Sequence, residues 1–334
     1  MLVGPNGSGK TTVLDALAVA IGPTTELPYA RPGFSLTPRR IVRKGALRAR
    51  VTCTLRFSSE EIEETRELFR LSEDPQEVPD AEQVTLTWTY PDPGEGHKEG
   101  LVEWEPAGAW ALLKGRVKLA RLLRTMRLSW SGFERAGRVV TFDQQRSWLG
   151  KTVRRDIWSI IQGADGGEDV SAAERWTSDP RTILLDMAIR SQLPGPEPHD
   201  NEFKRLQEQY AKLCAPRRIV GAVRDDMGAP DIQFSDGTYE YGYEGVSSGE
   251  SMLLLFLLRM IGERVHRSLI LVDEVELHQH PVWQRRLLHL IPRMGEFNQV
   301  LATTHSSYLR AVLPRGAIIE LGDLGDESSD GFDG

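Results

Sequence analysis

The chain has 334 residues, of which 40% are hydrophobic and 27% charged, and its formal net charge is −7. Such a composition is typical of a globular protein with a sizeable core, and the negative net charge argues against a uniformly basic surface made for nucleic acid. The longest apolar run, residues 252–258, is too short to span a bilayer. Two distant cysteines predict neither a disulfide framework nor a zinc site, so we expect a cytoplasmic protein.

The chain opens with a phosphate-binding loop. Residues 4–11 read G-P-N-G-S-G-K-T, which fits the pattern G-x-x-x-x-G-K-[ST]. Lys10 would reach the β- and γ-phosphates of a nucleotide, and the Thr11 hydroxyl would ligate Mg²⁺. The helical pattern that follows would direct its N-terminal dipole at the same anion. The predicted nucleotide-binding residues are Gly4, Asn6, Gly7, Ser8, Gly9, Lys10, Thr11 and Thr12.

The first half then shows the alternation of an antiparallel sheet. Residues 47–57 alternate as a strand, and Ser58 and Glu61 have the spacing of a capping box at the start of a helix. The segments 82–90 and 100–105 flank a turn-rich stretch and predict a long hairpin. A helix is expected over 109–127 and a buried strand over 137–145.

Interrupted helical patterns fill residues 150–228, where Pro and Gly clusters separate them. A hairpin is expected to turn at Asp236-Gly237. Helices and strands then alternate to residue 321, which is the rhythm of a parallel sheet. The last residues, 322–334, are acidic and poor in apolar side chains, so we expect a disordered tail.

A second half of the nucleotide site follows the apolar strand L-I-L-V. Asp273 stands where a Walker B aspartate would hold the magnesium shell, and Glu274 could accept a proton from attacking water. His305 follows the strand V-L-A-T-T and is expected at the carboxyl edge of the sheet, where ligands of open α/β sheets bind. Gln144 and Gln145 end the strand of the first half and could supply an oxygen to the metal or to water.

The stretch V-S-S-G-E, residues 246–250, precedes a strongly apolar helix. Hydroxyl and N–H groups at a helix N-terminus suit an anion. The alternative is an ordinary helix cap, because Ser is common at that position.

These motifs occur in one order along the chain: P-loop, glutamine-ended strand, S-S-G-E, D-E, E-L-H-x-H-P and T-T-H-S. In this order the chain resembles the ABC-type ATPases outside the transporters, a group that includes SMC, RecF and OLD-like proteins and many anti-phage defence ATPases. The run E-L-H-x-H-P, residues 276–281, discriminates best, because transporter ATPases usually carry a different loop there. The fold implied is α/β, with a mixed parallel sheet, an antiparallel β lobe and a helical insert.

The resemblance also implies roles for single residues. Lys10, Glu274 and His305 would be catalytic, with His305 as the switch histidine at the γ-phosphate. Thr11, Asp273 and Gln145 would serve the Mg²⁺ ion, although Gln144 is the alternative to Gln145. Ser247, Ser248 and Gly249 would form the signature that closes over ATP bound to a second copy.

Two functions remain open at this point. The first is a Mg-dependent ATPase whose ATP-sandwiched homodimer controls a separate effector, a nuclease or toxin, or a DNA transaction in defence or repair. The second is an ATP-locked scaffold with little hydrolysis that assembles such an effector. Glu274 favours the first function, and a transporter motor is disfavoured because no membrane segment is predicted.

The expected organisation is one ABC-type domain in four parts and a tail. These are the P-loop and helix at 1–22, the β lobe at 40–149, the insert at 150–228, the signature half at 229–321 and the tail at 322–334. Only Met1, Leu2 and Val3 precede the P-loop. Since the family places its first strands there, we expect residues upstream of Met1 and correspondingly weaker activity of this chain.

Two basic segments could bind DNA or RNA. Residues 31–50 hold seven Arg or Lys and no acid, and residues 112–128 place Lys114, Lys118 and Arg121 on one helical face. The alternative is a solvated face or a protein-docking surface. Aromatic side chains are not interleaved with these charges, so stacking on single strands has no special support.

Overall fold

The computed structural model describes residues 1–21, 42–70, 77–91, 100–113, 137, 139–142, 180–192, 201–262, 265–277 and 279–322. The chain divides into two compact units. The first unit consists of Met1–Gln144, His266–Val275 and Glu296–Gly334. The second unit consists of Gln145–Val265 and Glu276–Gly295.

A five-stranded parallel sheet organises the first unit. Its strand order is β11-β1-β10-β9-β5, and each neighbouring pair is parallel. The central strands are nearly continuous apolar runs, as expected for a sheet covered on both faces. The strands are β1 (Leu2–Val3), β5 (Val139–Phe142), β9 (Leu269–Val272), β10 (Gln299–Thr304) and β11 (Ile319–Glu320).

Strand β1, which leads into the P-loop, is only two residues long but has partners on both sides. Leu2 and Val3 are in register with Thr303 and Thr304 of β10 and with the two residues of β11. The N–H of Leu321 donates to the Val3 carbonyl at 2.7 Å, which continues the ladder beyond β11. Both ladders therefore fix the direction in which the chain enters the loop.

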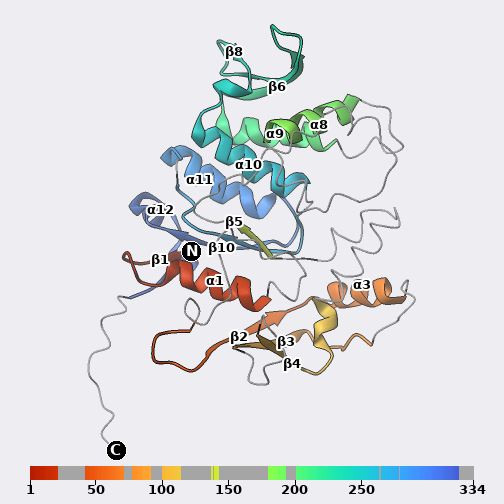
Figure 1. The fold of residues 1–334 in the computed structure, drawn as a ribbon, viewed down its shortest axis with the longest axis vertical. Helices are drawn as coiled ribbons and strands as arrows, with labels where there is room; N and C mark the ends of the chain where they lie inside the picture. The colour runs from red at the N-terminus through yellow and green to blue at the C-terminus, as the bar shows by residue number, and fades with distance from the viewer. Residues whose placement is uncertain are drawn as a thin grey trace, which may run out of the picture. The chain divides into compact units, whose positions relative to one another are not determined.

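Helix α1 (Lys10–Ile21) packs between the parallel sheet and an antiparallel sheet of the same unit (Figure 1). That second sheet has the order β2-β3-β4, with β2 at Ala49–Arg56, β3 at Gln83–Tyr90 and β4 at Leu101–Glu105. One hydrophobic cluster joins the three elements, since it contains Leu14 of α1, Leu86 of β3 and Leu271 of β9. The predicted first strand and long hairpin are confirmed.

Helix α3 (Ser59–Arg70) begins as its sequence predicts. The Ser58 hydroxyl accepts the Glu61 N–H at 3.2 Å, and a Glu61 carboxylate oxygen accepts the Ser58 N–H at 2.9 Å, which is a capping box. The helix expected over 109–127 is seen as a 3₁₀ helix at Ala109–Leu112. Residues 114–127 lie outside the described part of the chain, as do Lys114, Lys118, Arg121 and residues 31–41 of the basic segments.

The second unit packs helices against a small antiparallel sheet. Helix α9 (Glu202–Cys214) contacts α8 (Pro180–Gln192), α10 (Ser248–Gly262) and α11 (Pro281–Leu290). Fully buried side chains such as Leu184, Tyr210 and Phe234 form the core between them. The sheet has the order β6 (Arg218–Arg224), β7 (Pro230–Ser235) and β8 (Glu240–Tyr241). The hairpin between β7 and β8 turns at Asp236-Gly237 as predicted, and the Asp236 carboxylate accepts the N–H groups of Thr238 and Tyr239.

The sequence prediction was wrong for Arg218–Arg224, which lie within the range expected to be a helical insert. They form strand β6, paired antiparallel with β7 (Pro230–Ser235), while β8 is Glu240–Tyr241. The β-branched residues of this stretch suit a strand, but two arginines at its ends and Gly221 inside it mask the alternation. The register shifts between Ile219 and Gly221, which is a bulge that a simple period of two does not capture.

The remaining described elements are short. They are the helix α12 (Ser307–Val312) and 3₁₀ helices at Tyr243–Gly245, Ile291–Arg293 and Arg315–Ala317. Within the described ranges, no helix combines the length and apolarity needed to cross a membrane. Most of the predicted acidic tail, residues 323–334, lies outside the described residues.

The core of the antiparallel sheet can be tested at Leu86, whose side chain is fully buried in β3. Leu86→Ala should lower the free energy of unfolding by about 2–5 kcal/mol, because it leaves a cavity between α1 and the sheet. Urea denaturation followed by circular dichroism measures the change. Thr87→Ala is the matched control on the other face of the strand, where the Thr87 hydroxyl meets Thr52 at an exposed position. Equal losses in both variants would contradict the assigned core face.

Candidate functional site

The P-loop runs from β1 to the first turn of α1. Gly7 and Gly9 have φ values of 83° and 85°, which residues with a Cβ rarely adopt, so the glycines permit this turn. The Lys10 ammonium donates to the carbonyl oxygens of Gly4 at 2.9 Å and Pro5 at 2.8 Å. Lys10 therefore lies folded over its own loop and is buried at the point where phosphate would bind.

Space inside the loop is limited by close approaches around Gly4. A Cβ at Gly4 would lie 2.6 Å from both the Leu321 carbonyl oxygen and the Ser8 hydroxyl, so this position requires glycine. The buried Ser8 hydroxyl has no hydrogen-bond partner among the described residues. An unpaired buried hydroxyl beside a lysine ammonium suits a phosphate oxygen as its missing partner. Asn6 and Thr12, also predicted to bind nucleotide, are exposed.

Asp273 follows β9 and is 3% exposed. The Thr11 hydroxyl lies 3.1 Å from each oxygen of its carboxylate, so a predicted P-loop residue and the predicted Walker B aspartate meet directly. The Asp273 N–H donates to the Phe142 carbonyl of β5 at 2.8 Å, which fixes the backbone where the strand ends. A hydroxyl and a carboxylate in contact fit Mg²⁺, which usually takes few protein ligands and keeps several waters.

Thr303, at the end of β10, is a central residue of this site that the sequence reasoning did not single out. Its hydroxyl donates to an Asp273 carboxylate oxygen at 2.6 Å and accepts the Glu274 N–H at 2.8 Å. Its carbonyl accepts the Val275 N–H at 3.1 Å. Thr303 is completely buried and thus fixes the aspartate and the backbone after it. The motif T-T-H contains Thr303, but the sequence analysis used this motif only to predict a role for His305.

Glu274 and His305 face each other at the carboxyl edge of the parallel sheet. The His305 Nε2 atom lies 3.8 Å from a Glu274 carboxylate oxygen, and both side chains keep part of their surface open. Glu274 has a φ of 46°, an uncommon conformation for a residue with a side chain, and its N–H bond to Thr303 helps to hold it. Such backbone strain is frequent at functional sites.

A cavity of about 580 Å³ opens beside the P-loop and His305. Its volume lies within the usual range for small-molecule sites. Its lining includes the chain from Val3 to Asn6, the segment from Thr304 to Ser307, and Arg310, Glu320 and Leu321. The loop, the histidine and an arginine therefore share one open space within the first unit.

The predicted signature residues lie in the second unit, at the N-terminus of α10. The Ser247 hydroxyl accepts the Glu250 N–H at 3.3 Å, while the Glu250 carboxylate accepts the Ser247 N–H at 3.1 Å, so Ser247 caps this helix. The helix cap that the alternative reading predicts is therefore present, and the role of this stretch toward ATP stays a prediction. Ser247 and Ser248 are exposed, whereas Gly249 is buried.

Other predicted residues are placed only in part. Gln144 and Gln145 lie outside the described residues, so the third metal position stays a prediction, and His278 of the E-L-H-x-H-P run is also outside them. His280 caps α11 by accepting the Val282 N–H. No group of three or more His, Cys, Asp or Glu side chains suited to a metal occurs within the described ranges.

Comparison with protein families places both halves of the chain. Residues 1–95 match the family described as "AAA domain", and residues 145–311, half of the chain, match the family described as "AAA domain, putative AbiEii toxin, Type IV TA system". The chain belongs to this AAA domain family. The P-loop of the AAA domain lies in the first match, and Ser247, Asp273 and His305 lie in the second. Membership supports ATP binding and hydrolysis as the general activity.

One curated relative of the AAA domain is the Septu protein PtuA of Bacillus thuringiensis. It is 34% identical over 152 aligned residues, which span 39% of this chain and 37% of the relative. Two solved structures of Smc head domains, each bound to a domain of ScpA, align with 93% of this chain. Their sequences are 16% and 15% identical to this chain, and the alignments cover 83% and 84% of the Smc head chains. Both alignments have a TM-score of 0.45.

The Lys10 ammonium can be tested by Lys10→Met, which keeps an unbranched side chain without charge. Nucleotide affinity should fall at least about tenfold, because a charge-assisted contact to phosphate is worth more than 1 kcal/mol. Fluorescence titration with a labelled ATP analogue measures the affinity. The control is Lys204→Met, at a position exposed on α9. Unchanged affinity in the Lys10 variant would contradict the predicted phosphate site.

The Thr303 hydroxyl can be tested by Thr303→Val, which keeps the shape of the side chain. The free energy of unfolding should fall by about 1–3 kcal/mol, because Asp273 and the Glu274 N–H lose a buried partner. ATP turnover should fall as well, measured by phosphate release. Thr303→Ser retains the hydroxyl and should stay close to the unsubstituted protein in both measurements. Equal behaviour of the two variants would overturn this role for the hydroxyl.

Proposed function

We propose that this AAA domain protein is a Mg-dependent ATPase in which two copies close around ATP, and that closure controls a separate effector protein. The observation that carries the proposal is the contact of Thr11 with Asp273, with Glu274 and His305 beside them. The groups proposed to bind phosphate, to bind the metal and to accept the proton then occur together in one unit. The proposed compartment is the cytoplasm, because the free, buried cysteines Cys53 and Cys214 suit a reducing environment.

Each residue has a distinct part in the proposed reaction. Lys10 and the loop amides would bind the β- and γ-phosphates, and Thr11 and Asp273 would hold Mg²⁺, which supplies charge neutralisation on the phosphates. A water oxygen attacks the γ-phosphorus, the bond to the β-phosphate oxygen breaks, and Glu274 accepts the water proton. The products are ADP and phosphate. His305 would contact the transferring phosphoryl group.

A dimer around ATP would use the exposed hydroxyls of the signature. Ser247 and Ser248 stand at the N-terminus of α10, where the helix dipole favours an anion. A second copy could therefore present them to the γ-phosphate held by the P-loop of the first. Affinity between copies would then depend on the γ-phosphate, and hydrolysis would loosen the pair.

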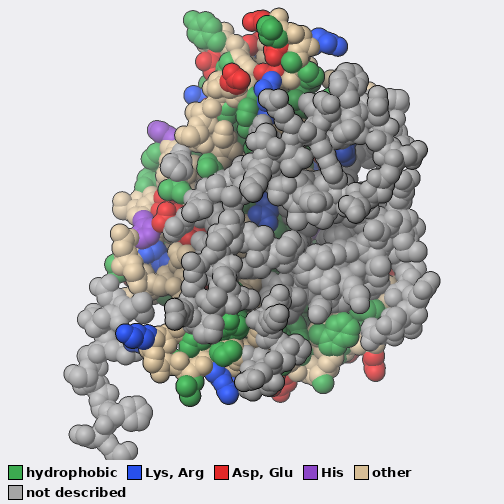
Figure 2. All heavy atoms as spheres, in the orientation of Figure 1, with side chains coloured by type: hydrophobic (Ala, Val, Ile, Leu, Met, Phe, Trp, Pro, Cys, Tyr) green, Lys and Arg blue, Asp and Glu red, His purple; other side chains and the backbone are tan. Residues whose placement is uncertain are grey.

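The proposed partner is a protein effector, a nuclease or toxin. The family description names a toxin, and the relative found is a Septu protein. DNA or RNA is the alternative partner. On the face in Figure 2, the described Lys and Arg side chains are scattered among acidic and apolar ones, so the described surface in this view offers no continuous basic patch to favour nucleic acid.

Glu274→Gln tests the proposal, because it removes the proton acceptor and preserves the size of the side chain. ATP turnover should fall by about 100-fold or more. In the presence of ATP, dimers should accumulate, whereas the unsubstituted protein should form them only transiently. Phosphate release and analytical ultracentrifugation measure the two effects. Glu296→Gln, at an exposed position of the same unit, is the control and should change neither.

The outcomes separate the proposal from its alternatives. Loss of turnover together with loss of the effector response supports an ATPase cycle. An effector response that survives without turnover supports an ATP-locked scaffold instead. Monomers at saturating ATP in the Glu274→Gln protein would overturn the shared site.

A further inference from the structure

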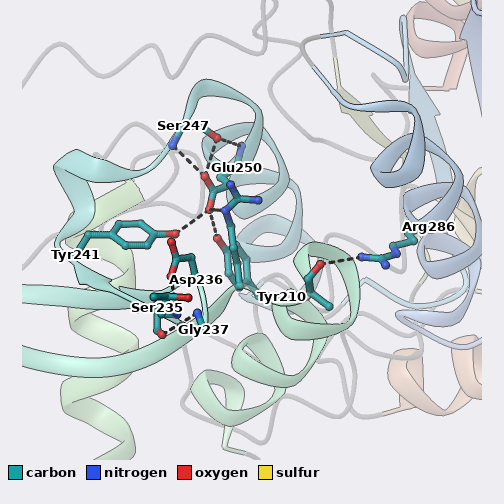
Figure 3. Close-up of polar contacts among 11 residues, drawn as sticks. Tyr210, Ser235, Asp236, Gly237, Tyr241, Ser247, Glu250 and Arg286 are labelled. Carbon is teal, nitrogen blue, oxygen red and sulfur yellow. Dashed lines mark hydrogen bonds and ion pairs between the residues drawn. The ribbon is translucent and has the colours of Figure 1, made fainter.

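The carboxylate of Glu250 is buried directly beneath the signature turn, residues 247–249 (Figure 3). The residue is 2% exposed, and five donor groups surround its two oxygens. One oxygen accepts the Ser247 hydroxyl at 2.6 Å and the Ser247 N–H at 3.1 Å. The other accepts the hydroxyls of Tyr210 at 2.8 Å and Tyr241 at 3.1 Å, and lies 3.3 Å from the Arg217 Nε atom.

This carboxylate is ionised at neutral pH. Burial alone would raise its pKa, but the hydrogen bonds from Ser247 and Tyr210 and the charge of Arg217 outweigh burial, so the pKa of Glu250 lies below its usual value. A buried charge without a counter-charge is costly. Among the described residues, Arg217 is the cation within ion-pair distance of Glu250.

Helix α11 holds Arg217 in place through two contacts. The Arg217 guanidinium lies over the Trp283 ring, 5.4 Å from its centre. The Arg286 guanidinium donates to the Leu213 carbonyl at 2.9 Å, at the end of α9, just before the turn that carries Arg217. The Arg217 N–H donates to the Cys214 carbonyl at 3.0 Å. A planar guanidinium can stack on a ring and donate at its edge at the same time.

We propose that Arg217 is a positioning residue for the signature turn. Its guanidinium neutralises the Glu250 carboxylate beneath Ser247 and fixes the turn against helix α11. The inference rests on the proposed function, because it concerns the approach of the γ-phosphate to Ser247. Without Arg217, the phosphate of the opposing copy would approach an uncompensated negative charge. Like charges that lie close together in a partly buried site repel measurably. Arg217 itself touches neither nucleotide nor metal in this scheme.

The test measures ATP-driven assembly of Arg217→Gln in the Glu274→Gln background, where turnover does not remove the dimer. The protein concentration for half-maximal dimer should rise about tenfold, a typical coupling between two sites. Binding of a labelled ATP analogue to the monomer should change less than about twofold, because the P-loop belongs to the other unit. In the hydrolysing protein, the loss should appear in the concentration dependence, while kcat at saturating protein stays within about threefold.

A reciprocal substitution separates charge from folding. Glu250→Gln removes the negative charge, keeps an oxygen that can accept the Ser247 N–H, and gives an amide that can donate to the tyrosine hydroxyls. The double variant Arg217→Gln/Glu250→Gln should therefore regain assembly to within about threefold of the parent. Arg217→Lys retains charge but loses the stacked geometry, so it should fall between the parent and Arg217→Gln. Arg190→Gln, which breaks an ion pair with Asp186 on α8, is the matched control and should have no effect.

Each outcome supports or overturns the inference. Weaker assembly of Arg217→Gln that the second substitution restores supports a role of charge at the signature. Assembly unchanged in Arg217→Gln, or a double variant no better than the single one, overturns that role while the shared ATP site stands. If the Glu274→Gln parent itself does not assemble with ATP, the proposed function fails, and the inference that rests on it fails too.

Discussion

The buried carboxylate of Asp273 is the constraint on which the first unit depends. It needs hydrogen-bond donors because water reaches it poorly, and the Thr11 and Thr303 hydroxyls supply them. These residues come from α1, the end of β9 and the end of β10, which are distant in sequence. Their contact therefore fixes the P-loop helix against two neighbouring strands at the edge where the loop opens. Strand β1, which leads into the loop, is paired with β10 on one side and with β11 on the other.

A second buried carboxylate, Glu250, organises the second unit by the same principle but with different partners. Two tyrosine hydroxyls, the cap of α10 and an arginine surround it, so helices α9 and α10 and the strand β8 meet at one charge. Burial raises the pKa of the Tyr241 hydroxyl to about 12, and the nearby Glu250 charge adds to this effect. The tyrosines thus remain protonated donors at any physiological pH. Glu250 carries the negative charge of this network, and among the described residues Arg217 is the cation that balances it, which makes Arg217 the sensitive member.

Local patterns in the sequence predicted the parts of the site that depend on neighbouring residues. The spacing of Gly4, Lys10 and Thr11, and the acids after an apolar strand, each describe one turn of chain, and the structure brings Thr11 and Asp273 together as that reading requires. Thr303 and Arg217 were not foreseen, because their roles arise from the register of parallel strands and from helix packing. Strand β6 was missed for a related reason: it is stable through pairing with β7, across a bulge that breaks its alternation.

The Ser247 hydroxyl has a single proton, and it is donated to Glu250 at 2.6 Å. A phosphate oxygen that approaches Ser247 must therefore compete with a carboxylate for that proton. The same carboxylate oxygen also accepts the Ser247 N–H, so the turn keeps a main-chain contact when the hydroxyl rotates away. If only the O–H bond turns and the Oγ atom stays in place, that atom can still accept the Glu250 N–H, so the turn loses one charge-assisted hydrogen bond and keeps the helix cap. In the proposed assembly, Arg217 would draw negative charge from Glu250 and weaken its hold on the proton, which would shift the competition toward the phosphate.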